Sequence, residues 1–145
     1  MTKIDPYKNK ERYLAWKEKN QSGIPEISKE NSDLTLRFLN DMESGLNICA
    51  TSKKGSRSYI RLNVLRQRLI ALSKAFEKRF NLTKITDITE IQLFSFFVDM
   101  RNGTIKRHDG KNYLSPKHFV KDFKALWHWW MKINRKQDIE LKDIT

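Results

Sequence analysis

The sequence predicts an all-α fold, and three observations support this. Apolar side chains recur at intervals of three and four residues along most of the chain, which is the spacing of one helical face. Only five glycines and three prolines occur among 145 residues. No long run alternates apolar and polar residues, so extended β-strands are not expected.

Two shorter helices are predicted first. One covers Tyr7–Lys19 and ends before the helix-breaking segment Gly23–Pro25. The next begins near Asn31 or Ser32, because both residue types favour the N-cap position. It ends at Gly45, since glycine is common just after the last helical turn.

The longest helix is predicted over Ser56–Phe80, from the end of a polar and basic loop at Thr51–Ser58. A fourth helix is expected to begin at Asp87, which is followed three residues later by Glu90 in a pattern that resembles a capping box. It ends at Asn102-Gly103. The apolar face predicted for it consists of Ile91, Phe94, Phe97 and Val98.

A small hairpin is expected near residues 104–114, because Asp109-Gly110 is a tight-turn signal. Ser115 and Pro116 form a cap followed by a first-turn proline, and so begin the last helix. The tail at 137–145 is polar, and by itself it is predicted to have nothing to pack against.

The charge balance favours a polyanionic partner. Lys and Arg number 29 against 17 Asp and Glu, which gives a net charge of +12 on a chain of single-domain length. The simpler interpretation is a basic protein with scattered, solvated lysines. No apolar run approaches the roughly 18 residues of a membrane span. The N-terminal segment lacks a signal sequence, and the single Cys49 suits a reducing compartment, so a cytoplasmic, nucleoid-associated location is expected.

Chemistry at a metal or a nucleophile has little support. The three histidines, His108, His118 and His128, are ten residues apart and distant from Cys49. The glycines are isolated and form no phosphate-binding loop. We therefore expect no cofactor, metal or catalytic residue in this chain.

The last helix has two separate stripes. At about 100° per residue, the apolar residues cluster within about 40° of Phe119, and a basic set lies roughly opposite. The apolar set is Phe119, Phe123, Leu126, Trp130 and Ile133, and the basic set is Lys117, Lys121, Lys124, His128 and Lys132.

The long helix carries a cluster of arginines beside its apolar seam, while Arg66 lies on the opposite flank. Arginine suits phosphates and guanine edges because its guanidinium is a planar fork. Free N–H groups and hydroxyls at the start of the helix can hold a phosphate. The arginines are Arg57, Arg61, Arg68 and Arg79, and the helix start adds Lys53, Lys54, Ser56 and Ser58.

Most aromatic residues lie on apolar faces, which favours core packing over stacking on single-stranded bases. Phe94 and Phe97 are among them, whereas Trp127 and Trp129 flank the apolar face of the last helix and are less clearly placed.

The order of these features resembles the N-terminal, core-binding half of a tyrosine recombinase, or phage-type integrase, and most closely the archaeal integrase-like members. The resemblance covers about Tyr7 to Thr145. It rests on YLAWKEKN, on FLNDMESGLN followed by KKGSRSYIRLNVLRQRL, on FFVDMRNGTIKRHDGKNYLS and on VKDFKALWHWWMKINRK.

The resemblance implies a SAM-like bundle of four main helices with Tyr7–Lys19 as an extra element. It also implies that the second and fourth main helices lie against duplex DNA. The four main helices would be Ser32–Ser44, Ser56–Phe80, Thr89–Arg101 and Pro116–Asn134.

The family's catalytic set is missing from this chain. The residues three positions after the histidines are Lys111, Lys121 and Met131, so no His-x-x-Arg box is present. Residues 1–136 are therefore predicted to be a DNA-binding domain that is not itself an enzyme. Residues 137–145 resemble the linker to a C-terminal catalytic domain, which would be a partner together with other recombinase protomers.

The predicted DNA contacts come from both basic helices, and the rival interpretations stay open. One rival is a stand-alone helical regulator. Another is a protein–protein module with Trp16, Trp127 and Trp129 as exposed anchors, and RNA binding is a weaker third. The predicted DNA-binding residues are Lys53, Lys54, Ser56, Arg57, Ser58, Arg61, Arg68, Ser115, Lys117, Lys121, Lys124 and His128.

Overall fold

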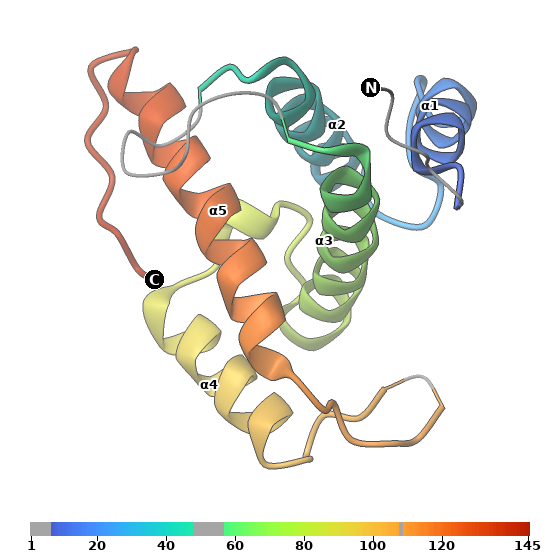
Figure 1. Ribbon diagram of the computed structural model, residues 1–145. Helices are drawn as coiled ribbons and strands as arrows, with labels where there is room; N and C mark the ends of the chain where they lie inside the picture. The colour runs from blue at the N-terminus through green and yellow to red at the C-terminus, as the bar shows by residue number, and fades with distance from the viewer. Residues whose placement is uncertain (1–6, 48–56, 108) are drawn as a thin grey trace.

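The computed structural model describes residues 7–47, 57–107 and 109–145 of the chain (Figure 1). Within these residues it is an all-α bundle, so the predicted fold class is confirmed. The helices are α1 (Asn9–Lys19), α2 (Lys29–Ser44), α3 (Tyr59–Phe80), α4 (Glu90–Arg101) and α5 (Pro116–Arg135), with a 3₁₀ turn, η1 (Ile85–Asp87), between α3 and α4.

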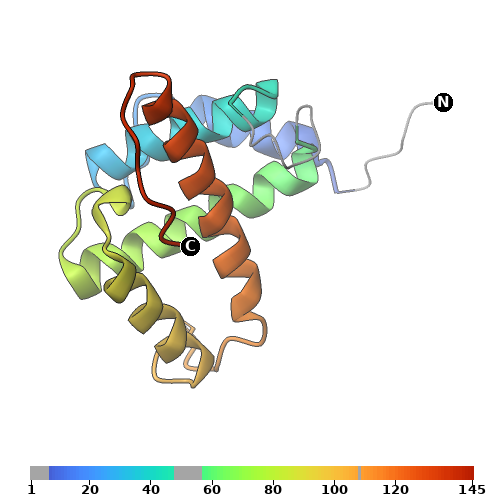
Figure 2. The same cartoon turned by 90° about the vertical axis from the view of Figure 1, so that its left-hand side faces the viewer.

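The long helix α3 organises the bundle. Helices α1 and α2 pack against it on one side, and α5 crosses it on another (Figures 1 and 2). Helix α4 packs against α5. The predicted 3/4 spacing of α3 is confirmed, because its apolar seam is buried: Leu62, Leu65, Leu69, Leu72 and Phe76 are at most 1% exposed.

Aromatic rings join α3, α4 and α5. The ring of Phe76 lies 4.9 Å from that of Phe96 and 6.0 Å from that of Phe123, in edge-to-face arrangements. Each such buried ring contributes roughly 1.5–3 kcal/mol through the apolar surface that it removes from water. These ring contacts therefore hold α5 at a fixed angle across α3.

Helix α2 begins earlier than predicted, at Lys29, with the Ser28 hydroxyl accepting a hydrogen bond from the Asn31 amide at 3.1 Å. The residues predicted as caps have other roles. The Asn31 side chain accepts from the Ile85 amide at 2.6 Å, and the Ser32 hydroxyl accepts from the Ile24 amide at 2.6 Å. Both side chains are buried, because they satisfy backbone groups of neighbouring segments.

Helix α4 begins later than predicted. Thr89 and Gln92 form a reciprocal capping box, at 3.1 Å and 3.0 Å, in place of Asp87 and Glu90. Asp87 instead closes the turn η1 that buries Ile85. The start of the helix is shifted because this turn occupies the residues that were expected to cap it.

The hairpin expected near residues 104–114 is reduced to one antiparallel β-bridge between Lys106 and Asn112 among the described residues. Gly110 supports the turn in the left-handed region, with φ of 82°. The Gly110 amide donates to the Arg107 carbonyl at 2.9 Å. The described part of this segment is therefore a loop closed by a turn, with a single bridge in place of strands.

The C-terminal tail does find a packing surface, contrary to the expectation from its polarity. After Asp138, which has φ of 61°, the chain reverses and runs back beside α5 (Figure 2). The Trp127 indole N–H donates to the Lys142 carbonyl at 3.0 Å, and Ile144 packs against the core. Residues 137–145 therefore form part of the folded domain.

Candidate nucleic-acid interface

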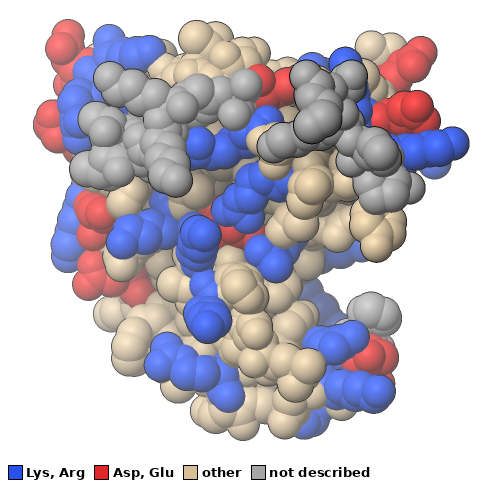
Figure 3. All heavy atoms as spheres, in the orientation of Figure 1, with Lys and Arg blue, Asp and Glu red and all other residues tan. Residues whose placement is uncertain are grey.

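A row of lysines follows the outer face of α5. Lys117, Lys121 and Lys124 are all exposed, as the helical spacing predicts. Their ammonium groups have no hydrogen-bond or ion-pair partner in the part of the chain that the structure describes. Figure 3 shows Lys and Arg atoms gathered along the face that α5 crosses, while acidic atoms lie mostly at its margins. The row is therefore available to an anionic partner.

His128 continues this row but is already engaged. Its Nε2 atom lies 2.9 Å from Oδ2 of Asp143 in the tail, and its side chain is only 23% exposed. Burial acts to raise the pKa of Asp143, but hydrogen bonds from the Thr145 hydroxyl and amide and from His128 together lower that pKa below its ordinary value. The carboxylate therefore stays charged against the histidine.

Arg61 and Arg68 lie one above the other on α3 and share one carboxylate on α5. Asp122 is 0% exposed, and its Oδ2 accepts from Nη1 of Arg68 at 2.9 Å while its Oδ1 accepts from Arg61. The Arg68 guanidinium also lies 5.9 Å from the centre of the Phe119 ring. Two of the predicted DNA-binding residues therefore also join α3 to α5.

The pairing with Asp122 leaves most of the guanidinium N–H donors of Arg61 and Arg68 without a hydrogen-bond partner among the described residues. Each guanidinium has five N–H donors, and one bond to Asp122 is present for each. Both side chains are 27% exposed, so part of each guanidinium faces solvent beside the lysine row. The Arg61–Arg68–Asp122 cluster has a net charge of +1, because two cations share one buried anion.

The start of α3 is fixed by its own cap and by α2. The Ser58 hydroxyl accepts from the Arg61 amide at 3.2 Å, and the Arg57 amide donates to the Met42 carbonyl at 2.9 Å. Ser115 occupies the N-cap position of α5, with Pro116 next, but makes no side-chain capping bond. Lys53, Lys54 and Ser56 lie outside the described residues.

The remaining arginines of α3 face other neighbours. Arg66 is on the opposite flank, as predicted, with its guanidinium 5.1 Å from the Trp16 ring and its Nε donating to Asn63 at 2.9 Å. Arg79 pairs with Asp99 of α4. The structure thus separates Arg61 and Arg68, which flank α5, from arginines that brace other contacts.

Sequence reasoning missed both acids in this region. Asp122 lies between the apolar stripe and the lysine row of α5, and a charge so close to a buried face needs a partner. Arg61 and Arg68, seven residues apart on one face of α3, were the sequence signal for that partner. No sequence signal identified Asp143, because its contact depends on the reversal of the tail.

The core face predicted for α4 was partly wrong, and the structure places the two tryptophans that the sequence left open. Phe94 is 70% exposed and Ile91 is 81% exposed, whereas Phe96 takes the core position. Trp127 and Trp129 are only 5% and 1% exposed, so the rival protein–protein module lacks two of the exposed anchors that it would need.

Comparison of the chain with protein-family models, with curated proteins and with solved structures found no significant match. Among the described residues, no group of three His, Cys, Asp or Glu side chains is arranged to hold a metal ion; Cys49 and His108 lie outside them. None of the helices described here combines the length and apolar character needed to cross a membrane.

Proposed function

We propose that this chain is the DNA-binding domain of a site-specific recombinase, and that α3 and α5 hold one face of a duplex recombination site. The observation that carries the proposal is the exposed row of Lys117, Lys121 and Lys124, which has no partner among the described residues and lies on the helix that crosses α3 at the partly exposed Arg61 and Arg68. A net charge of +12 on 145 residues adds a long-range attraction for a polyanion.

The spacing of the lysine row suits a phosphate backbone. Seven residues separate Lys117 from Lys124, which corresponds to about 10 Å along a helix. The major groove of B-DNA is about 12 Å wide and admits an α-helix, so one helix can present such a row to the phosphates that border the groove. Lysines act there as point charges and position the protein without reading sequence.

Arg61 and Arg68 have a different role in the proposal. Because Asp122 holds each guanidinium by one donor, the remaining donors keep a fixed direction. A fixed planar fork loses less side-chain entropy on binding than a free one, and it suits phosphates and guanine edges. Ser58 and Ser115 at the helix starts would add hydroxyl and amide contacts to phosphates.

The recombinase part of the proposal rests on the resemblance in sequence order, and on the two cationic helices being the ones that the resemblance would place against DNA. Strand cleavage would belong to a separate catalytic domain, and residues 137–145, which pack back along α5, would lead toward it. Reading the coding sequence beyond codon 145 tests this part: an open frame with Arg, His-x-x-Arg and Tyr supports it, and a frame without them refutes it.

Salt-dependent binding to a fluorescein-labelled duplex tests the DNA-binding part. Fluorescence anisotropy at about 50–200 mM salt should give a log–log slope that reports the number of phosphate contacts. The triple variant Lys117→Gln/Lys121→Gln/Lys124→Gln should lower the magnitude of that slope by about 2.7, since each lost contact removes about 0.9.

A matched variant controls for net charge alone. Lys19→Gln/Lys29→Gln/Lys78→Gln also removes three exposed lysines, but from α1, α2 and the end of α3. It should change the magnitude of the slope by less than about 0.9, which is the contribution of one phosphate contact. Equal losses in the two variants, or an affinity indifferent to salt, would contradict the proposed interface.

A further inference from the structure

Helix α4 is apolar on nearly all of its sides, including the side that faces solvent. Leu93, Phe96 and Phe97 point inward and are at most 6% exposed. Ile91 and Phe94, three residues apart, are 81% and 70% exposed. A helix that is apolar all round is ordinarily buried on all sides. The outer side of α4 therefore has the composition of a contact surface.

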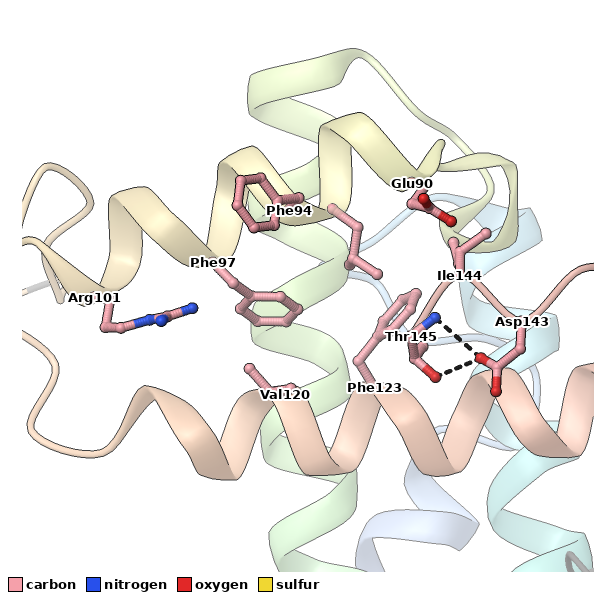
Figure 4. Close-up of a pocket in the computed structure, with 10 residues that line it drawn as sticks. Glu90, Phe94, Phe97, Arg101, Val120, Phe123, Asp143, Ile144 and Thr145 are labelled. Atoms are coloured by element: carbon pink, nitrogen blue, oxygen red, sulfur yellow. Dashed lines mark hydrogen bonds between the residues drawn. The ribbon is translucent and has the colours of Figure 1, made fainter.

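The exposed Phe94 borders a groove that runs between α4 and α5. The groove has a volume of about 500 Å³, and the end of the tail closes one of its ends. Figure 4 shows α4 on one side, with Phe94 and Phe97, and α5 on the other, with Val120 and Phe123. Its walls are therefore largely aromatic and aliphatic.

The charged side chains at the two ends of the groove differ in whether they have a partner of opposite charge within the chain. At the tail end, Glu90 pairs with Lys142 at 3.1 Å, and Asp143 accepts from His128 at 2.9 Å. The opposite end holds Arg101, which is exposed and lines the groove (Figure 4). Arg101 has no ion-pair or hydrogen-bond partner within the described residues.

Two further cations flank the groove on α5. Lys117 and Lys124 lie three residues before and four residues after Val120, so they are its neighbours on the helix surface. Both are exposed, and neither has a partner in the described part of the chain. The acids at this groove are thus neutralised internally, and the charge left without a partner is positive.

We propose that this groove docks an amphipathic helix of a partner protein. Apolar side chains of that helix would enter between Phe94, Phe97 and Val120, as in other helix-in-groove complexes. Acidic side chains along its edge would face Arg101, Lys117 and Lys124. The site is separate from the proposed DNA contact of Arg61 and Arg68, although Lys117 and Lys124 border both surfaces.

The charges argue against two other occupants. A second copy of this chain would bring another protein of charge +12, with the same cationic edge, against the groove. Single-stranded bases stack on successive exposed rings, but Phe94 is the one strongly exposed ring that the described groove offers. An acidic helix satisfies both the apolar walls and the unmatched cations.

Selection from a display library of helix-forming peptides tests the proposal. The peptides, about five turns long, carry random residues on one face and are selected on the immobilised 145-residue chain. Peptides that also bind the variant Ile91→Ser/Phe94→Ser are removed. The enriched peptides should carry apolar residues at i, i+3 or i+4, and i+7, flanked by Asp or Glu.

A matched variant distinguishes binding in the groove from nonspecific binding to exposed apolar side chains. Leu46→Ser/Ile60→Ser also replaces two exposed apolar residues, which are 58% and 62% exposed and lie elsewhere. An enriched peptide should bind this variant as it binds the wild type. It should bind Ile91→Ser/Phe94→Ser about tenfold more weakly. The separate variant Arg101→Glu should also lower the affinity for peptides that carry acidic residues.

Four results would overturn the proposal. The first is the absence of enrichment, and the second is enrichment of peptides without acidic residues. The third is a wild-type dimer in sedimentation that dissociates in Ile91→Ser/Phe94→Ser, since the occupant would then be a second copy. The fourth is a loss of about tenfold in affinity for fluorescein-labelled oligo-dT in that variant alone, which would identify a stacking site.

Discussion

The carboxylate of Asp122 on α5 accepts a hydrogen bond from Nη1 of Arg68 on α3 at 2.9 Å, and Arg61 occupies its other oxygen. The pairing is unequal, because Asp122 is 0% exposed while each arginine side chain is 27% exposed. A guanidinium that loses its partner here can turn toward water. A carboxylate that loses both partners cannot, so the anion depends on the cations more than they depend on it.

This inequality predicts an order of effects on stability. The variant Arg61→Met/Arg68→Met leaves a buried carboxylate without a partner and should lower the free energy of unfolding by about 3–5 kcal/mol. Asp122→Asn keeps the shape of the side chain and should cost about 1–3 kcal/mol. Urea unfolding followed by circular dichroism measures both. A larger loss for Asp122→Asn would show that the arginines are the more dependent partners.

The elements of this fold were predictable wherever apolar spacing gave one unambiguous face. Helix α3 meets that condition, and its predicted seam, from Leu62 to Phe76, is buried. Helix α4 does not, because apolar residues occur on nearly all of its sides. Spacing alone could not choose between Phe94 and Phe96 for the core, and the wrong residue was chosen.

Helix starts and ion pairs depended on contacts that sequence does not display. Asn31 and Ser32 have the chemistry of caps, but they bond to Ile85 and Ile24 from elsewhere in the fold. The candidate site shows the same limit. Lys117 could be placed on an exposed face from helical spacing, whereas the pairing of Asp122 depends on how α5 crosses α3.

The register of α4 can be tested with one pair of phenylalanines. Phe97 is 6% exposed and lies in the core, so Phe97→Ala should cost about 3–5 kcal/mol. Phe94 is 70% exposed, so Phe94→Ala should change stability by less than about 0.5 kcal/mol. Thermal or urea unfolding of the two variants decides the register. Similar losses for both would restore the face predicted from the sequence.

The start of α4 can be tested in the same way. Thr89 caps the helix and pairs reciprocally with Gln92, so Thr89→Ala should cost about 1 kcal/mol. Asp87 was the cap expected from the sequence, yet it is exposed and ends the turn η1. Asp87→Ala should therefore cost less than Thr89→Ala in urea unfolding, and the reverse order would move the helix start back to Asp87.

The docking of the tail should depend on pH through Asp143. Its pKa is lowered in the folded protein, so its contribution to stability is fully present above the ordinary carboxyl pKa of about 4. That contribution is lost as the pH falls through the lower folded-state value. Asp143→Asn should therefore lower the free energy of unfolding by roughly 0.5 kcal/mol at neutral pH, because the pair with His128 lies near the surface.

The loss caused by Asp143→Asn should disappear in acid, where the wild-type carboxyl is also protonated. Glu140→Gln is the matched control, since it removes the same charge from the same tail at a side chain that is 79% exposed and 3.7 Å from Arg135. It should leave stability unchanged at both pH values. Urea unfolding followed by circular dichroism at both pH values measures these differences in stability. A difference between Asp143→Asn and wild type that persists in acid, below the folded-state pKa of Asp143, would assign the effect to the shape of the side chain, since the charge is then absent from both proteins.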